Sequence, residues 1–324
     1  MATVGTATKQ FHAELGVSVR EDLMDRIINK SPLDTPLFSM TPDGPATGNI
    51  KVEYLTDTTT GGFAANVFAD GADYSFAQLG VRTRKANYCQ LLDTTWSVGK
   101  LLDAADQAGL TSEYSYQMTK AMGNHGLACE YAVTYGVSAT GNSATATQVT
   151  TGSKMAGYVA HILTYSASGD STSAGFSVAA VNTIVQSIVT ATTGKPSLIL
   201  CAPVLKASAS SWALPATKNI NVEDKRYVAS IAIYDGDFAL FTFQWDRWLA
   251  VANSPTVAGV GITAKCDRAL ILDMSTWNKA TYLRTVAEEV PVAAFAKRGV
   301  MNTCFTIRAL AEQCNGVYCG ATAA

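Results

Sequence analysis

Apolar and polar positions follow two different periods along this chain, and these periods predict its helices and strands. Apolar residues recur at helical spacing through residues 19–28 and again through residues 110–135. Residues 50–54 instead alternate between apolar and charged side chains, which is typical of a strand with one buried face. The chain therefore mixes helices and strands, with no internal repeat of solenoid length.

The segment 110–135 is the strongest predicted helix. A stripe spaced by three and four runs through it, and a helix of about 23 residues spans roughly 35 Å. Gly123 and Gly126 interrupt it, although glycine costs about 1 kcal/mol relative to alanine in an exposed helix. We therefore expect a bend or close packing of another backbone there. His125 lies on the apolar stripe without a spaced partner, so we expect a partly buried histidine with satisfied hydrogen bonds.

The middle and the end of the chain predict a compact α+β subdomain followed by further strands. Residues 156–264 contain two helices (176–189 and 204–212), a strand (198–202) and a hairpin (227–233 and 238–248) around Asp235-Gly236-Asp237. Beyond them, predicted strands cover 269–273, 281–283, 292–296 and 304–310, with a turn at 297–299.

The first 90 residues lack a core of their own. Residues 1–18 are polar, helix 19–28 ends before Ser31-Pro32, and a proline-rich extended segment follows. Its apolar side chains need a neighbouring surface, which another copy of the chain can provide; these are Leu33, Leu37, Phe38 and Met40. Residues 50–54 and 79–92 predict two strands joined by the polar stretch 56–73. Composition alone favours an ordinary surface loop for that stretch, and an extended hairpin is the alternative.

Composition and charge narrow the function classes. The 324 residues are 48% hydrophobic and 15% charged, which argues against disorder. The formal net charge of −2 argues against a dedicated sequence-specific DNA-binding protein, because such proteins need a basic excess. Residues 1–10 lack a signal-peptide pattern, and no apolar run approaches the roughly 20 residues of a membrane span. We therefore expect a soluble protein that is not exported by Sec.

Signatures of catalysis and of metal binding are missing from the sequence. There is no phosphate-binding loop, dinucleotide fingerprint, zinc-protease motif or nucleophile elbow, and the three histidines have no nucleophile signature beside them. Glu288-Glu289 fit a solvated loop better than an acid–base pair. The seven cysteines form no CxxC, so we expect buried thiols in a reducing compartment. We expect no enzyme activity, no cofactor and no metal.

Several segments, in this order, resemble the major capsid (major head) proteins of tailed bacteriophages with the Hong Kong 97-type shell fold, most closely the long-arm podovirus-like branch. The departures are Cys89, where a β-branched residue is usual, and Arg298, where threonine is usual. The segments are REDLMDRII (20–28) with SPLDTP (31–36), NYCQ (87–90), WSVG (96–99), EYSYQ (113–117) with Glu130, ILDMSTW (271–277) and FAKRG (295–299).

The resemblance implies an α+β capsid fold in five parts. These are an N-terminal arm (1–48), an extended hairpin loop (49–90), a peripheral domain with a spine helix (91–155), an axial domain (156–264), and return strands that complete the peripheral domain (265–324). Arm and hairpin would then bury apolar surface between subunits. The implied contact residues are Leu33, Leu37, Phe38 and Met40 on the arm and Phe63, Phe68, Tyr74 and Phe76 on the hairpin.

The implied function is structural: self-assembly of hexamers and pentamers into an icosahedral head around packaged double-stranded DNA, in the host cytoplasm. Implied partners are other copies of the chain, scaffold and portal proteins, a decoration protein, and DNA held by weak non-specific contacts; no membrane is involved. Two alternatives stay open from the sequence. One is the shell of a cellular encapsulin-type nanocompartment, and the other is an intracellular hydrolase with an unrecognised site.

Overall fold

The computed structural model describes residues 31–57, 69–71, 73, 76, 81–105, 112–139, 152–171, 175–212, 232–252, 265–291 and 294–321. Its elements, in chain order, are α2 (Pro36–Met40), β1 (Lys51–Thr56), β2 (Thr83–Tyr88), β3 (Gln90–Gly99), α3 (Lys100–Asp103), α4 (Glu113–Tyr135), α5 (Tyr158–His161), β4 (Tyr165–Asp170), α6 (Val178–Ala191), β5 (Leu198–Cys201), α7 (Pro203–Ser210), β6 (Ile233–Asp235), β7 (Leu240–Trp245), η1 (Arg247–Leu249), β8 (Asp267–Leu272), η2 (Met274–Thr276), β9 (Trp277–Val290), β10 (Ala296–Ala309), η3 (Glu312–Cys314) and β11 (Gly316–Ala321).

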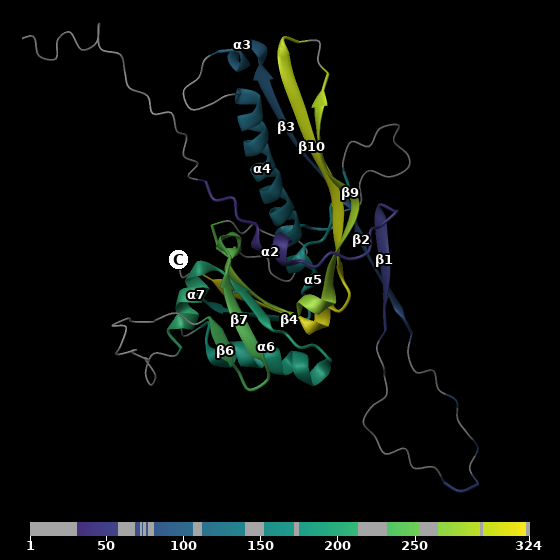
Figure 1. Cartoon of the computed structure of the whole chain (residues 1–324). Helices are drawn as coiled ribbons and strands as arrows, with labels where there is room; N and C mark the ends of the chain where they lie inside the picture. Colours follow the sequence, from purple (N-terminus) through teal and green to yellow (C-terminus); the bar gives the residue numbers. More distant parts are fainter. Residues whose placement is uncertain are drawn as a thin grey trace, which may run out of the picture.

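The described strands form three separate sheets. A three-stranded sheet in the order β3-β10-β9 lies beside the long helix α4 in the narrow upper part of Figure 1. The compact body below contains a six-stranded sheet in the order β4-β11-β8-β5-β7-β6. The third sheet is the hairpin of β1 and β2, which projects from the side of the molecule (Figure 1). The expected α+β architecture is therefore present.

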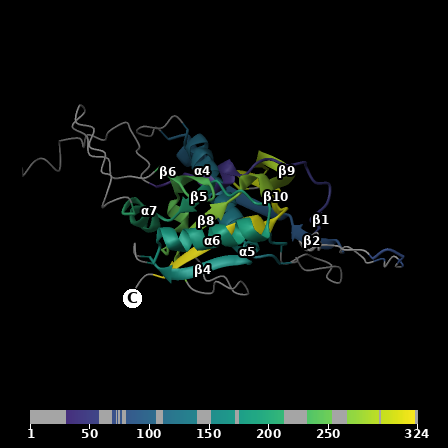
Figure 2. The same ribbon diagram turned by 90° about the horizontal axis from the view of Figure 1, so that it is seen from below.

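Helices α6 and α7 pack on the six-stranded sheet, as the view from below shows for α6 (Figure 2). Both helices approach strand β11 where that strand has glycine. A Cβ atom on Gly316 would collide with Ile184 of α6, and one on Gly320 would lie 3.2 Å from the Leu205 side chain of α7. The two glycines thus allow both helices to lie close to one face of this strand.

The predicted boundary at residue 264 does not coincide with the edge of the six-stranded sheet. Strands β8 and β11, which we assigned to the return strands of the peripheral part, are interior strands of this sheet instead. Every residue of β8 is buried, because β8 lies between β11 and β5 with neighbours on both sides. The segment 156–264 alone would therefore leave the sheet without two of its interior strands.

Helix α4 begins and packs as its sequence predicts. The Ser112 side chain caps the first turn by accepting a hydrogen bond from the Ser115 amide at 3.4 Å. The glycines in α4 accommodate the arm: a Cβ on Gly123 would lie 3.0 Å from Leu33, and one on Gly126 would lie 3.6 Å from Thr35. The close neighbours at these glycines are thus arm side chains.

Three predictions near the end of the chain are wrong. Residues 294 and 295, predicted within a strand over 292–296, lie in the connection between β9 and β10. Residues 297–299, expected to form a turn, lie within strand β10. Gly299 is needed there because the Trp96 ring of β3 covers it so closely that a Cβ would overlap the ring. Glu288 and Glu289, expected in a loop, lie in the exposed half of strand β9. A glycine covered by an aromatic side chain therefore looked like a turn signal in the sequence.

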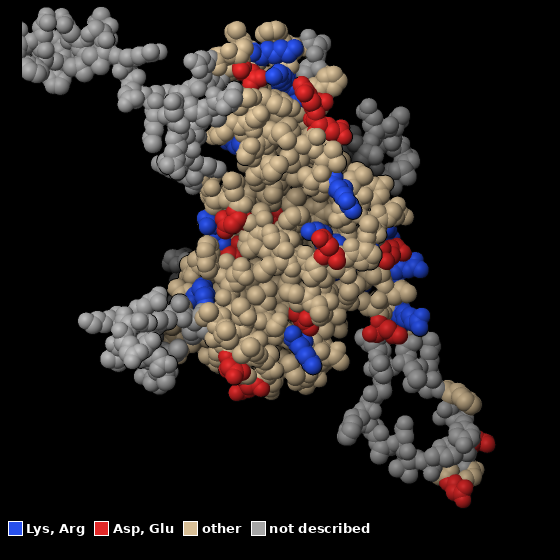
Figure 3. All heavy atoms as spheres, viewed as in Figure 1, with Lys and Arg blue, Asp and Glu red and all other residues tan. Residues whose placement is uncertain are grey.

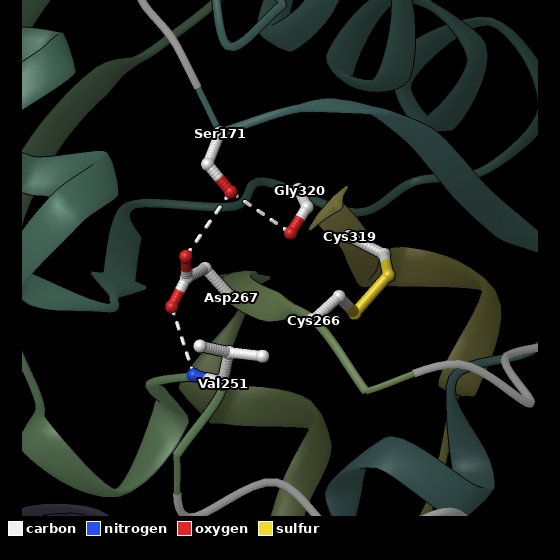
Figure 4. The surroundings of a disulfide bond; sticks show 6 residues. All are labelled: Ser171, Val251, Cys266, Asp267, Cys319 and Gly320. Atoms are coloured by element: carbon white, nitrogen blue, oxygen red, sulfur yellow. Dashed lines mark hydrogen bonds between the residues drawn. A yellow bond between two sulfur atoms is a disulfide. The ribbon is translucent and has the colours of Figure 1, made fainter. Parts of the chain in front are cut away.

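The cysteines differ in part from the expectation of free thiols. Cys266 and Cys319 form a disulfide with a Cα–Cα distance of 5.7 Å, and it joins the beginning of β8 to the last described strand (Figure 4). Beside it, the buried Asp267 carboxylate accepts hydrogen bonds from Ser171 Oγ at 3.0 Å and from the Val251 amide at 2.8 Å. The other five cysteines are free and buried, as expected.

Candidate assembly surfaces

The arm segment that precedes the hairpin is fixed to the body by a buried carboxylate. Glu130, on the inner face of α4, accepts hydrogen bonds from the amides of Leu37 at 3.0 Å and Phe38 at 2.8 Å, at the beginning of α2. The Leu37 side chain is completely buried in the main core. The Thr41 hydroxyl, at the end of α2, donates to the Leu37 carbonyl and lies 3.1 Å from the Tyr158 hydroxyl. Helix α2 is therefore anchored within its own chain.

After α2 the chain runs alongside β9. The Lys279 amide donates to the Pro42 carbonyl at 2.8 Å, and the Gly44 amide donates to the Lys279 carbonyl at 2.8 Å. The Lys279 ammonium also lies 4.3 Å from the centre of the Phe38 ring. These contacts hold the segment between α2 and β1 along β9, so that it runs from the side of α4 to the base of the hairpin.

Two buried carboxylates lie in this region, and burial raises the pKa of both. The pKa of Glu130 rises to about 7 because desolvation outweighs the two amide hydrogen bonds, and the nearby Asp246 carboxylate adds repulsion. Burial likewise raises the pKa of Asp246 to about 6, although the Trp248 amide donates to its carboxylate. The arm anchor therefore contains groups that exchange protons near neutral pH.

The base of the hairpin is held mainly by the buried side-chain amide of Asn87, with a further contact from Gln90. Asn87 of β2 donates to the carbonyls of Ala156 at 3.1 Å and Ile307 at 2.8 Å, and it accepts from the Ala156 amide at 2.9 Å. Gln90, at the beginning of β3, accepts from the Met155 amide at 3.2 Å. Both amides of the NYCQ motif thus bind the same short loop before α5, and they fix the direction in which the hairpin leaves the body.

Beyond this base, the described residues of the chain give the hairpin little cover. Its strands pair in antiparallel register from Lys51↔Tyr88 to Thr56↔Thr83, and exposed ion pairs such as Lys51–Glu53 decorate them. An isolated two-stranded hairpin is marginally stable in water. Yet this one exposes Ile50 and Leu55, and the Phe76 side chain is 97% exposed. These side chains thus offer apolar surface that the described residues leave exposed.

A second exposed apolar surface lies on the outer half of β9. From Tyr282 to Val290 every residue of this strand is exposed, and β9 is an edge strand of its sheet. Long exposed edge strands readily pair with other chains unless they are protected. We call the apolar members of this stretch the β9 row; they are Tyr282, Leu283, Val286 and Val290.

The far end of the upper part is fixed by a charged cluster. Asp103, at the end of α3, accepts hydrogen bonds from Lys297 Nζ at 2.7 Å, from the Tyr114 amide at 3.2 Å and from the Ser112 hydroxyl at 3.0 Å. The Lys297 ammonium and these donors hold the pKa of Asp103 at about 2. The lysine of the FAKRG motif therefore ties β10 to the beginning of α4, next to exposed Leu101, Leu102 and Phe295.

The predicted contact residues fall into three groups. The prediction for Leu37 is wrong, because the main core of the same chain buries this side chain completely. Phe38 and Met40 are half-buried against the same core. Leu33, which is 42% exposed, and Phe76 have side-chain surface to offer a neighbour. The remaining predicted residues, together with helix 19–28, lie outside the described residues; they are Phe63, Phe68 and Tyr74.

Asn87 and Glu130 belong to the segments that resemble capsid proteins, but the sequence predicted no role for either residue. The structure gives both of them anchoring roles, and both side chains are buried. A buried polar group must find hydrogen-bond partners. Their partners, however, lie 69 and 93 residues away along the chain, so no local pattern identifies them.

The described residues show no group of three or more potential metal ligands close together. His125 is buried between Thr94 at 3.1 Å and Thr303 at 2.8 Å, and burial lowers its pKa. The histidine is thus satisfied by hydroxyl groups, as expected from its position on the stripe. Within the described part of the chain, each helix is too short or too polar to cross a lipid bilayer.

Comparisons with known proteins agree with this geometry. The SU10 major capsid protein family matches residues 2–322 of the chain. No curated protein matches the chain in sequence. Among solved structures, a chain from Mycobacterium phage Ogopogo matches with a TM-score of 0.66 at 11% identity, covering 95% of this chain and 99% of that one.

Two further structures show the same fold. The capsid of Myoviridae phage XM1 matches with a TM-score of 0.64 at 10% identity, covering 93% of this chain and 97% of that one. The capsid of a native GTA particle matches with a TM-score of 0.61 at 10% identity, covering 98% and 100%. The chain therefore has the Hong Kong 97-type fold, and it belongs to the SU10 major capsid protein family, the structural shell proteins of tailed-phage heads.

Proposed function

We propose that copies of this chain form hexamers and pentamers that close into an icosahedral shell around packaged double-stranded DNA, and that the hairpin, Leu33 and the β9 row are inter-subunit contacts. The role is structural and not enzymatic. The observation that carries the proposal is the hairpin, which exposes apolar side chains on and beside a two-stranded sheet that the described residues leave largely uncovered. Burial between subunits stabilises by about 25 cal/mol per Å² of apolar surface, repeated at each copy.

The five proposed parts acquire roles in this assembly. Residues 49–90 reach a neighbouring subunit, as does the arm 1–48 apart from its part from α2 onward, which packs on its own chain. Residues 91–155 with the spine helix α4 form the peripheral domain. Residues 156–264 form most of the axial domain, to which β8 and β11 also contribute. The side of this domain near β6 exposes Ile233, Phe238 and Leu240 beside a groove of about 460 Å³, and we place it toward the symmetry axes.

Contacts with DNA are proposed to be weak and independent of sequence. On the face in Figure 3, Lys and Arg side chains lie in small groups, several of them beside Asp or Glu, with large uncharged areas between the groups. Such a surface provides few phosphate contacts, so it holds packaged DNA without binding it tightly. Scaffold, portal and decoration proteins are proposed further partners, and assembly is proposed to take place in the host cytoplasm.

The test is assembly of the purified chain, with its scaffold protein if one is required, followed by electron microscopy and sedimentation. The variant Leu283→Asp places a charge in the β9 row and should reduce shell yield at least tenfold. Leu163→Asp is the matched control, because Leu163 and Leu283 are 52% and 51% exposed and Leu163 lies on the body after α5. Equal shell yields from the two variants would contradict the assigned contact surface, and a strict monomer from the unmodified chain would contradict the proposal itself.

A further inference from the structure

Two of the five free cysteines lie against each other where the hairpin joins the body. Cys89, between β2 and β3, and Cys304, in β10, form a small buried cluster with Val52 of β1. The Cys89 amide donates to the Ile50 carbonyl at 2.7 Å, so this residue belongs to the base of the hairpin. Cys304 belongs to the middle strand of the three-stranded sheet. The pair therefore spans the joint between the projecting hairpin and the body.

Cys89 and Cys304 occupy the same relative positions in their strand pair as the disulfide-bonded Cys266 and Cys319 occupy in theirs. In the β8–β11 pair the last partners are Asp267↔Gly320, so Cys266 is opposite residue 321 and Cys319 is two residues from that position. Cα atoms on this diagonal are 5.7 Å apart, within the range of disulfides.

The β3–β10 pair repeats the pattern at its own end. The last partners are Gln90↔Phe305, so continuing the register by one residue places Cys89 opposite Thr306, and Cys304 is again two residues away. Both pairs are antiparallel, and both cysteine pairs have the same diagonal offset. In a twisted antiparallel pair this relationship fixes which side chains meet. A geometry that accepts one disulfide in this chain thus recurs at the base of the hairpin.

We propose that Cys89 and Cys304 are a second disulfide site, and that oxidation of this pair fastens the base of the hairpin to strand β10. The bond would connect residues 215 positions apart across the joint about which the hairpin is attached. This proposal goes beyond the structural function of the shell, and it depends on the thiol pair alone and not on the assigned subunit contacts.

The chemistry requires an oxidant, for which a low-molecular-mass disulfide such as oxidised glutathione suffices. Cys304 attacks as the thiolate, one sulfur of the oxidant bonds to Cys304, and one glutathione thiolate leaves. Cys89 then loses its proton, attacks the Cys304 sulfur and displaces the second glutathione thiolate. In total the protein loses two hydrogen atoms, and the oxidant becomes two thiols.

The order of attack follows from the environment of the two sulfur atoms. Contact with the neighbouring thiol lowers the pKa of Cys304, because the remaining S–H stabilises a single thiolate, and the same contact together with burial raises the pKa of Cys89. Both side chains are almost fully buried, so the reagent reaches Cys304 only when the base of the hairpin opens. Reclosure then brings Cys89 to the mixed disulfide.

The test counts thiols in the full-length protein before and after incubation with oxidised glutathione. Samples are denatured and alkylated without reductant, and intact mass gives the number of labelled cysteines. We expect five labels before oxidation and three afterwards, with a peptide map that links Cys89 to Cys304 in a single chain. Five labels after oxidation, stable glutathione adducts, or links between chains or to other cysteines would each overturn the proposal.

Single substitutions separate this pair from the other thiols. Cys129→Ser is the matched control, since Cys129 is equally buried but lies in the main core; oxidation should reduce its labels from four to two. Cys89→Ser and Cys304→Ser should each keep four labels under the same treatment. Should either serine variant fold poorly, the peptide map of the unmodified protein still decides the question.

Discussion

The anchoring of α2 yields a quantitative prediction for Leu37→Ala. Leu37 is completely buried, and truncating a buried leucine to alanine costs 2–5 kcal/mol through lost transfer energy and the remaining cavity. Because the side chain lies between the short helix α2 and the core, we expect about 3 kcal/mol here. At 1.36 kcal/mol per factor of ten, this weakens the docking of α2 by roughly 150-fold.

Amide hydrogen exchange measures this change locally. The amides of Leu37 and Phe38, which donate to Glu130, and that of Thr41, which donates to the Leu37 carbonyl, should exchange about 100-fold faster in the variant. Leu33→Ala is the matched control, because Leu33 lies four residues earlier, is 42% exposed and should change these amides less than fivefold. Less than a threefold change in Leu37→Ala would refute the idea that the side chain anchors the arm.

Three other predictions test the anchors and the sheet. Burial raises the pKa of Glu130 from 4.5 to about 7, so the folded state keeps its proton to higher pH. Glu130 alone should therefore lower the free energy of unfolding by about 3 kcal/mol as pH rises from about 4.5 to 7. Denaturant titrations of Glu130→Gln should lack this contribution and keep the separate fall due to Asp246. Gly299→Ala should destabilise by more than about 2 kcal/mol, because the new methyl group overlaps Trp96; an unchanged thermal midpoint and unchanged tryptophan fluorescence would contradict this. Asn87→Ala leaves buried partners at Ala156 and Ile307 unsatisfied and should cost about 2–4 kcal/mol, with faster proteolysis of the hairpin as the readout; equal proteolysis rates would count against its anchoring role.

Local elements of the fold could be predicted from sequence because local patterns determine them. The cap at Ser112 and the stripe after it placed α4 to within a few residues, and Asp235-Gly236-Asp237 correctly marked the connection between β6 and β7. Residues 50–54 likewise predicted β1. These predictions depend on neighbours in sequence, where hydrogen-bond and side-chain periods are short.

Long-range pairings could not be predicted in the same way. The insertion of β11 between β4 and β8 depends on residues about 150 and 50 positions away, and a short apolar strand does not reveal its partners. Leu37 was assigned to a neighbouring subunit because its apolar character shows that it needs burial, but not which surface buries it. Gly299 was predicted to lie in a turn. The residue must be glycine because the ring of Trp96, some 200 residues earlier, covers it, and the local sequence does not show this contact.

The position of β11 also has a consequence for synthesis. Strand β4 pairs in parallel with β11, and about 150 residues must follow β4 before that neighbour exists. At roughly 5–20 residues per second, the ribosome needs about 8–30 s for this stretch. During that interval β4 lacks the neighbouring strand β11, so the six-stranded sheet is incomplete. Pairing of β4 within this sheet therefore waits until β11 has been synthesised.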